Sequence, residues 1–130
     1  MTAFFSSGYH IIANILALIM VDAEIFKLMA LSLPDAEELP HFEMASFRWH
    51  HKIFATLRES DMRCMIKLSL IDQDVFCAYN RDVFFTVPGT WGKQGSTFVN
   101  LNLVDPDMLY DALSCAYQSI VDKPKPRKRK

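Results

Sequence analysis

The sequence predicts an α+β fold, a two-layer α/β sandwich in which a mostly antiparallel sheet carries helices on one face. Apolar residues alternate with polar ones through the middle of the chain, segments with helical periodicity stand on either side, and short polar loops join the alternating segments. Short connections place neighbouring strands antiparallel, and strands with a single apolar face need helices on that face. The expected order is helix, three or four strands, helix, two strands and helix.

The chain is long enough for one domain with a core of its own. Its 130 residues are 51% hydrophobic and 12% aromatic and include only four glycines, which excludes a collagen-like, disordered or coiled-coil protein. We expect a single domain over residues 20–122, an apolar extension over residues 1–19 and a disordered basic tail over residues 123–130.

The extension contains no Lys or Arg. A signal peptide carries basic residues before its apolar stretch, and the apolar run over residues 11–20 is too short to cross a bilayer. We interpret residues 1–19 as an upstream segment that need not be native, with the domain starting near Met20. The alternative is a membrane-anchoring or core-docking helix, because apolar periodicity alone does not separate these cases.

The first helix is predicted to begin after Asp22, whose side chain can cap it, and to end at Pro34. Four apolar residues recur at helical spacing and are expected on its buried face. They are Ile25, Leu28, Met29 and Leu33.

After a loop over residues 34–38, the apolar period drops to 2 and predicts antiparallel strands. The strands are expected at residues 45–49, 53–57 and 64–68, with a possible short strand at 39–42. In the second of these, Ile53, Ala55 and Leu57 alternate with Phe54 and Thr56. His50 and His51 stand where a tight turn is needed.

Ser69 and Asp72 resemble a capping box ahead of a second helix, with apolar residues at helical spacing. These apolar residues are Ile71, Val75, Phe76 and Tyr79. A second hairpin is expected from strands at 83–87 and 97–103, joined by a glycine-rich loop at 88–95.

The last helix is the clearest, with Asp105 as its cap and Pro106 in its first position. Its apolar stripe is Leu109, Ala112, Leu113, Ala116, Tyr117 and Ile120.

Charge is divided unevenly along the chain. Six of the 14 basic residues lie in the last eight positions, whereas residues 1–122 hold eight Lys and Arg against 15 Asp and Glu, a net charge of −7. Such a body repels phosphate backbones at long range, so nucleic-acid binding needs a local basic face or the tail.

The three cysteines, Cys64, Cys77 and Cys115, form no C-x-x-C pair and are an odd number. We interpret them as reduced interior residues, and we therefore expect a cytoplasmic protein.

No residue pattern indicates catalysis. His41, His50, His51 and Cys64 lack the spacing of a metal site, and no nucleophile stands in a known motif. We expect no metal, no cofactor and no enzymatic activity.

Cations interleaved with aromatic rings on the hairpins, together with the basic tail, are the candidate contacts to nucleic acid, because such faces stack bases and neutralise phosphates. The candidates are Arg48, Lys52, Arg58, Arg63, Lys93, Lys123, Lys125, Arg127, Lys128, Arg129 and Lys130. Trp49, Lys67 and Trp91 are candidates for a surface or pocket. The alternative makes Trp49 and Phe54 core or edge residues, the cations ordinary surface charge and the tail a solubilising end.

Short motifs over residues 21–122 resemble the MmcQ/YjbR family of small bacterial proteins, of the DUF419 type. They are Leu31-Ser32-Leu33-Pro34, Pro40-His41-Phe42, Lys52-Ile53-Phe54-Ala55-Thr56-Leu57, Lys67-Leu68, Val87-Pro88-Gly89 with Trp91-Gly92, and Ala112-Leu113 with Ala116-Tyr117. The resemblance implies a topology related to type III secretion chaperones and described as a double-wing DNA-binding fold. It supplies no catalytic residues.

Three hypotheses follow. The first is a non-enzymatic MmcQ/YjbR-like protein that binds DNA. The second is a chaperone-like module that binds a protein partner or forms a homodimer. The third, with the least support, is a small-molecule enzyme with a pocket near Trp49, Lys67 and Trp91. No contact with a membrane is favoured.

Overall fold

The structure is a computed structural model that describes residues 21–122. The expected extension at 1–19 lies outside the described residues. So do six of the nucleic-acid candidates, namely Lys123, Lys125, Arg127, Lys128, Arg129 and Lys130.

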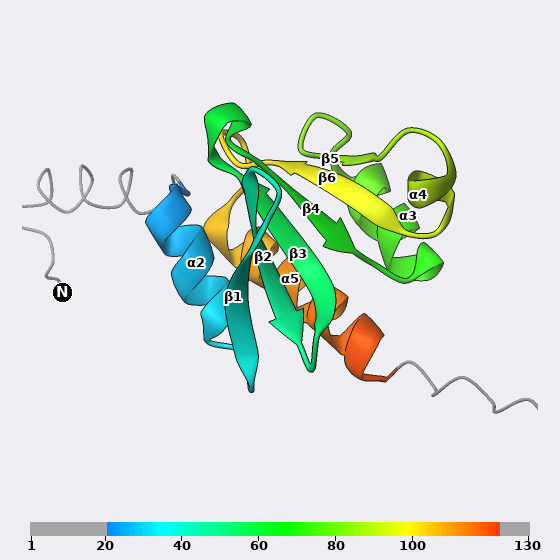
Figure 1. Cartoon of the computed structure of the whole chain (residues 1–130). Helices are drawn as coiled ribbons and strands as arrows, with labels where there is room; N and C mark the ends of the chain where they lie inside the picture. Colours follow the sequence, from blue (N-terminus) through cyan, green and yellow to red (C-terminus); the bar gives the residue numbers. More distant parts are fainter. Residues whose placement is uncertain (1–20, 123–130) are drawn as a thin grey trace, which may run out of the picture.

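A six-stranded, fully antiparallel sheet in the order β1-β2-β3-β4-β6-β5 forms one layer, and helices cover one of its faces (Figure 1). This confirms the expected fold class. The elements are α2 (Ala23–Leu31), β1 (Ala36–His41), β2 (Met44–Trp49), β3 (Lys52–Arg58), a 3-10 turn (Glu59–Asp61), β4 (Arg63–Lys67), α3 (Leu70–Tyr79), β5 (Phe84–Thr86), α4 (Thr90–Lys93), β6 (Ser96–Asn100) and α5 (Pro106–Val121).

The three expected helix caps are confirmed. Asp22 Oδ1 accepts a hydrogen bond of 2.9 Å from the Ile25 N–H, and Ser69 Oγ accepts one of 3.1 Å from the Asp72 N–H. Asp105 Oδ2 accepts hydrogen bonds from the N–H groups of Asp107 and Met108 in the first turn of α5, and Pro106 is the first residue of that helix. Each cap satisfies backbone donors that have no partner within the helix, which explains why these helices begin where they do.

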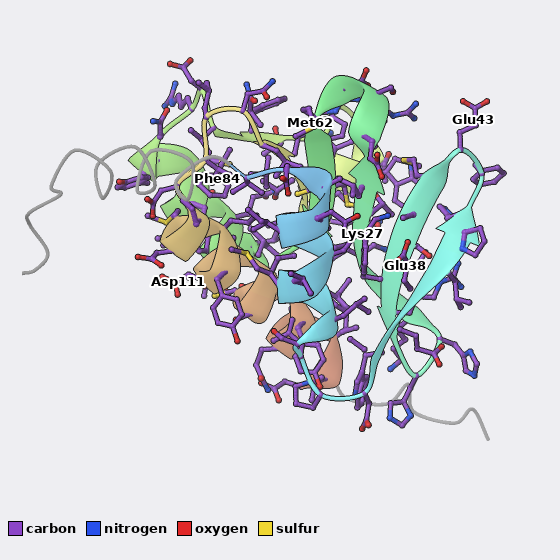
Figure 2. The ribbon with its side chains drawn as sticks, turned by 90° about the vertical axis from the view of Figure 1, so that its left-hand side faces the viewer. Lys27, Glu38, Glu43, Met62, Phe84 and Asp111 are labelled. Carbon is purple, nitrogen blue, oxygen red and sulfur yellow. The ribbon has the colours of Figure 1, made fainter. Side chains whose placement is uncertain are left out.

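The core lies between the sheet and α5. All six residues of the predicted α5 stripe are buried, and the ring of Tyr117 packs edge-on against Phe54 of β3. The Tyr117 hydroxyl donates a hydrogen bond of 2.6 Å to the carbonyl oxygen of Pro34, which ties α5 to the end of the α2 segment. Figure 2 shows α2 beside α5, with Lys27 between the helix and Glu38 of β1.

The buried face of α2 differs from the prediction, and most of the apolar residues that predicted α3 are exposed. In α2, Leu28 is exposed and Phe26 and Ala30 are buried, because α2 packs against Phe47 of β2 and against α5. In α3, Gln73 and Phe76 are buried, whereas three of the four apolar residues at helical spacing are exposed. The exposed residues are Ile71, Val75 and Tyr79.

Two of the predicted loops contain regular structure. The first strand starts at Ala36, inside the expected loop at 34–38, because Asp35 takes a left-handed φ of 61° and all six residues of β1 then pair with β2. The short helix α4 lies in the expected loop at 88–95, where a four-residue helix leaves no periodic signal in the sequence.

A β-bulge breaks the predicted alternation in β3. Phe47 of β2 pairs with Ala55 and the next residue, Arg48, pairs with Ile53, so that Phe54 is an extra residue in β3. A bulge of this kind shifts the phase of the side chains. Phe54 and Ala55 are both fully buried, whereas Ile53 points to the opposite, open face, so Ile53 and Ala55 do not share a face as expected.

None of the helices within residues 21–122 is long and apolar enough to cross a membrane.

Candidate binding groove on the open face of the sheet

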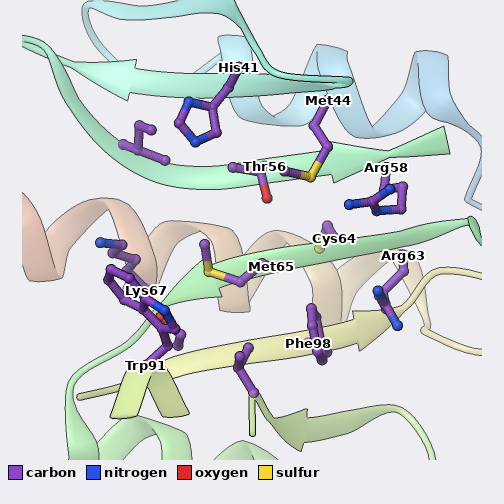
Figure 3. Close-up of a pocket in the computed structure, with 13 residues that line it drawn as sticks. His41, Met44, Thr56, Arg58, Arg63, Cys64, Met65, Lys67, Trp91 and Phe98 are labelled. Carbon is purple, nitrogen blue, oxygen red and sulfur yellow. The ribbon is translucent and has the colours of Figure 1, made fainter. Parts of the chain in front are cut away.

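The face of the sheet opposite α5 holds a groove of about 460 Å³ (Figure 3). Outward-facing residues of β3, β4 and β6 form its floor, and α4 contributes Trp91 to one end. Three cations point from the floor, namely Arg58, Arg63 and Lys67, and its lining includes no Asp or Glu. The groove therefore combines positive charge with an apolar and aromatic surface.

Two of the cations lie against aromatic rings. The guanidinium carbon of Arg63 is 4.1 Å from the ring centroid of Phe98 on the neighbouring strand β6. The Lys67 Nζ is 5.9 Å from the ring centroid of Trp91. These contacts hold the charges beside two rings, of which Trp91 is exposed and Phe98 is half-buried, and such an arrangement suits a flat, anionic ligand.

Asp61 stands at the rim beside the two arginines. Its Oδ2 is 3.5 Å from Arg58 Nε and 3.6 Å from Arg63 Nη2, and all three side chains are partly exposed. Ion pairs that are open to solvent contribute little net free energy, so a phosphate or carboxylate of a ligand can replace Asp61 at low cost.

Close backbone packing positions Trp91. A Cβ at Gly92 would lie 1.8 Å from the Val87 carbonyl oxygen, and a Cβ at Gly95 would lie 2.0 Å from the Leu68 carbonyl oxygen. Glycine at these two positions allows the α4 turn to approach the sheet, and the Trp91 side chain remains 62% exposed at the end of the groove.

Cys64 borders the groove, but its sulfur is buried on the helix side of β4. Burial strongly raises the pKa of the Cys64 thiol. The thiol therefore stays protonated, and a protonated thiol is a poor nucleophile.

The structure brings four of the predicted candidates together, namely Arg58, Arg63, Lys67 and Trp91. Arg48 lies outside the groove and donates a 2.9 Å hydrogen bond from Nε to Ser46 Oγ. Lys52 and Lys93 are exposed and do not line the groove.

Trp49 lies on the helix side of the sheet, 6.4 Å from Tyr117 between ring centroids. The expected pocket near Trp49, Lys67 and Trp91 is therefore wrong, because Trp49 and Lys67 point to opposite faces of the sheet. Phe54 is a core residue and Trp49 is partly buried against the core, in agreement with the alternative interpretation of these two rings.

Sequence reasoning missed Phe98 and Met65 as parts of the groove. The sequence contained a signal for Phe98, because it lies between Thr97 and Val99 in a predicted strand. Successive residues of a strand point to opposite faces, so Phe98 faces the side opposite to Thr97 and Val99. Its neighbour Arg63 could not be assigned without knowing that β4 pairs with β6.

His41 lines the groove, whereas His50 and His51 do not. His50 and His51 form the two-residue turn between β2 and β3, with left-handed φ values of 48° and 70°. Within residues 21–122, no three His, Cys, Asp or Glu side chains are arranged to hold a metal ion.

Fold and groove together define a class, an antiparallel α+β domain with a cationic, aromatic groove on its uncovered sheet face. No family model and no curated protein matches the sequence. Among solved structures, the crystal structure of Deinococcus radiodurans protein DR2400, which has a DUF419 domain, is similar, with a TM-score of 0.70 and 16% sequence identity over 80% of this chain and 81% of that chain. At this identity the likeness shows the fold, so the chain has a DUF419-type fold.

Proposed function

We propose that this chain is a non-enzymatic, cytoplasmic protein of the MmcQ/YjbR family that binds single-stranded nucleic acid in the groove on its open sheet face. The DUF419-type fold supports the family, and the three free thiols support the cytoplasm. The observation that carries the binding function is the meeting of Arg58, Arg63 and Lys67 with Trp91 and Phe98 in one groove.

Each part of the groove matches a part of a nucleotide. The exposed face of Trp91 and the ring of Phe98 offer stacking surfaces for bases, and base stacking on an aromatic side chain contributes about 1–3 kcal/mol per base. Arg63 and Lys67 stand next to these rings and are placed to neutralise the phosphates between stacked bases.

The charge distribution favours a single strand over a duplex. The groove is a recess, and unpaired bases can turn into it, whereas paired bases are held inside the double helix. A duplex also extends its phosphates beyond the groove, over a body with a net charge of −7.

The test is fluorescence anisotropy of the full chain with a labelled single strand of about 12 nucleotides and with its duplex. We expect tighter binding of the single strand, and a slope of log K against log salt of about −2 for three phosphate contacts. Trp91→Ala should weaken binding about tenfold or more, from the loss of one stacked base.

Arg63→Gln should weaken binding and make the salt slope shallower, while the matched control Lys93→Gln should leave both unchanged, because Lys93 is a cation outside the groove. A full-length variant with the six tail cations replaced by Gln separates groove from tail. If only that variant loses binding and Trp91→Ala binds normally, the groove is not the site. Equal affinity for duplex and single strand would also contradict the proposal.

A second candidate function, a protein-interaction module, is favoured by the exposed apolar face of α3, which is independent of the groove.

A further inference from the structure

The side of α3 that faces away from the sheet carries an apolar stripe. The exposed fractions of its residues are 77% for Ile71, 61% for Val75 and 68% for Tyr79. Residues four positions apart lie one above another on a helix, so these three side chains form a continuous ridge over two turns. The opposite side of α3 buries Gln73 and Phe76, so the ridge is not needed for packing within residues 21–122.

Carboxylates stand on both sides of this ridge. At 3.6 residues per turn, Asp74 lies on one flank of the line from Ile71 to Val75, and Asp72 lies on the other flank. Asp72 is also close to α5, since Asp72 of α3 and Cys115 of α5 line the same hollow.

The two helices form one acidic surface. Within their bounds, α3 and α5 carry four aspartates and no Lys, Arg or His. These are Asp72, Asp74, Asp107 and Asp111. Figure 2 shows Asp111 on the side of α5 that faces away from the sheet. The positive groove and the acidic helices therefore occupy opposite faces of the domain.

A hollow of about 870 Å³ continues the surface where the ridge ends. It lies between the start of α3 and the end of α5. Its lining includes Leu70, Ile120, Asp72 and Asp122, together with Lys67 and Trp91 from the end of the groove. Leu70 is itself exposed. The hollow thus continues the apolar and acidic side chains beyond the ridge and reaches the end of the groove at Lys67 and Trp91.

The aspartates beside the α3 ridge indicate which kind of molecule can bind there. A second copy of this chain would oppose aspartates to aspartates, and nucleic acid or an anionic membrane would be repelled. Residues 1–20 of this chain contain no Lys or Arg and would leave the carboxylates without countercharges. We propose that the α3 ridge is a docking site for an amphipathic helix of a partner protein, with apolar side chains along one stripe and Lys or Arg on both flanks.

The test uses three model peptides with the full chain. The first is a Leu/Lys amphipathic helix of about 18 residues, the length at which such a helix forms alone in water. The second is a scrambled Leu/Lys peptide of the same composition, and the third is a Leu/Glu helix of the same pattern. Titration calorimetry measures affinity, and amide chemical shifts in an ¹⁵N spectrum locate the contact.

We expect the Leu/Lys helix to bind with shifts concentrated in residues 70–79, and the other two peptides to bind at least about tenfold more weakly. Val75→Glu should reduce the affinity by about tenfold or more, because it places a charge in the centre of the ridge. Leu28→Glu is the matched control, since Leu28 is a 70% exposed apolar residue on α2. Asp72→Asn with Asp74→Asn should weaken binding and remove most of its salt dependence.

Equal binding of the scrambled peptide, or equal binding to Val75→Glu and Leu28→Glu, would overturn the proposal. Two further results would assign the ridge to another occupant. Dimerisation of the full chain that Val75→Glu abolishes would identify a second copy. A gain of peptide affinity in a full-length variant with Ile12→Glu and Leu16→Glu would identify the chain's own apolar segment.

Discussion

The side-chain amide of Gln73 donates a hydrogen bond of 2.9 Å to the carbonyl oxygen of Gly92. The same nitrogen lies 3.2 Å from the Ser96 carbonyl oxygen and 3.1 Å from Thr97 Oγ1, all in a buried environment. Gln73 therefore connects the inner side of α3 to the turn that carries Trp91. The residue links the element with the apolar ridge to the element that closes one end of the groove.

Replacing Gln73 by Leu should destabilise the protein by about 1 kcal/mol or more, because the buried carbonyl of Gly92 loses one of its donors and keeps only backbone N–H partners such as that of Gly95. Urea unfolding measures this change. Trp91 fluorescence should also change in the folded state, since its turn is no longer held to α3. Gln118→Leu is the matched control, because Gln118 is an exposed glutamine whose substitution should cost less than about 0.5 kcal/mol. Equal costs for the two variants would show that the Gln73 bonds do not stabilise the fold.

Because of the bulge in β3, we expect substitutions at Ile53 and Ala55 to have different effects on stability, whereas strict alternation would predict similar effects. Ala55→Gln should destabilise by about 3 kcal/mol or more, because it forces a larger polar side chain into a fully buried position. Ile53→Gln should cost only about 1 kcal/mol, since Ile53 is half-buried on the open face. Chemical denaturation of both variants decides the point. Similar costs would place Ile53 and Ala55 on the same face and contradict the bulge.

The turn between β2 and β3 is occupied by residues that are poorly suited to it. His50 and His51 both have left-handed φ values, a conformation that Gly adopts without steric cost. His51→Gly should therefore stabilise the protein by about 0.4–1 kcal/mol, measured as a higher thermal midpoint. His50 packs against Trp49 at 4.2 Å between ring centroids, so His50→Gly should gain less. A lower midpoint for His51→Gly would mean that its ring makes a stabilising contact.

The three thiols should differ in reactivity and in pH dependence. Burial raises the pKa of Cys77 and of Cys115, with nearby aspartates adding to the effect, and raises that of Cys64 much further. Only the thiolate reacts with iodoacetamide, so the native protein at pH 8 should be alkylated slowly at Cys77 and Cys115 and not at Cys64. Below the pKa of each thiol, its alkylation rate should rise by about tenfold per pH unit, because the thiolate fraction does.

Peptide mass spectrometry after timed alkylation measures these rates, with the urea-unfolded chain as the control in which all three cysteines react alike. Rapid native modification of Cys64 would show that β4 opens to solvent. The raised thiol pKa values also make stability depend on pH. The unfolded thiols ionise at lower pH than the folded ones, so the free energy of unfolding should fall once the pH exceeds the ordinary thiol pKa.

The sequence by itself determined the fold class, the starts of three helices and the buried stripe of α5. These features depend on local rules, namely a capping side chain next to the helix it caps and an apolar repeat that matches the helical period. The tail and extension lie outside the described residues, so their roles remain predictions.

Tertiary contacts decided the rest. The sequence showed Ile71, Val75 and Tyr79 at helical spacing in α3, but these side chains are exposed. Gln73 and Phe76 are buried instead, because Gln73 finds buried backbone and hydroxyl partners near Gly92 that only the folded chain provides. Arg63 and Phe98 meet because β4 pairs with β6. These strands are distant in the sequence, since β4 begins at Arg63 and β6 begins 33 residues later, at Ser96. Periodicity shows that a helix or strand has two faces. Which face is buried depends on neighbours that are distant in the sequence, and for that reason the groove and the ridge emerged only from the folded structure.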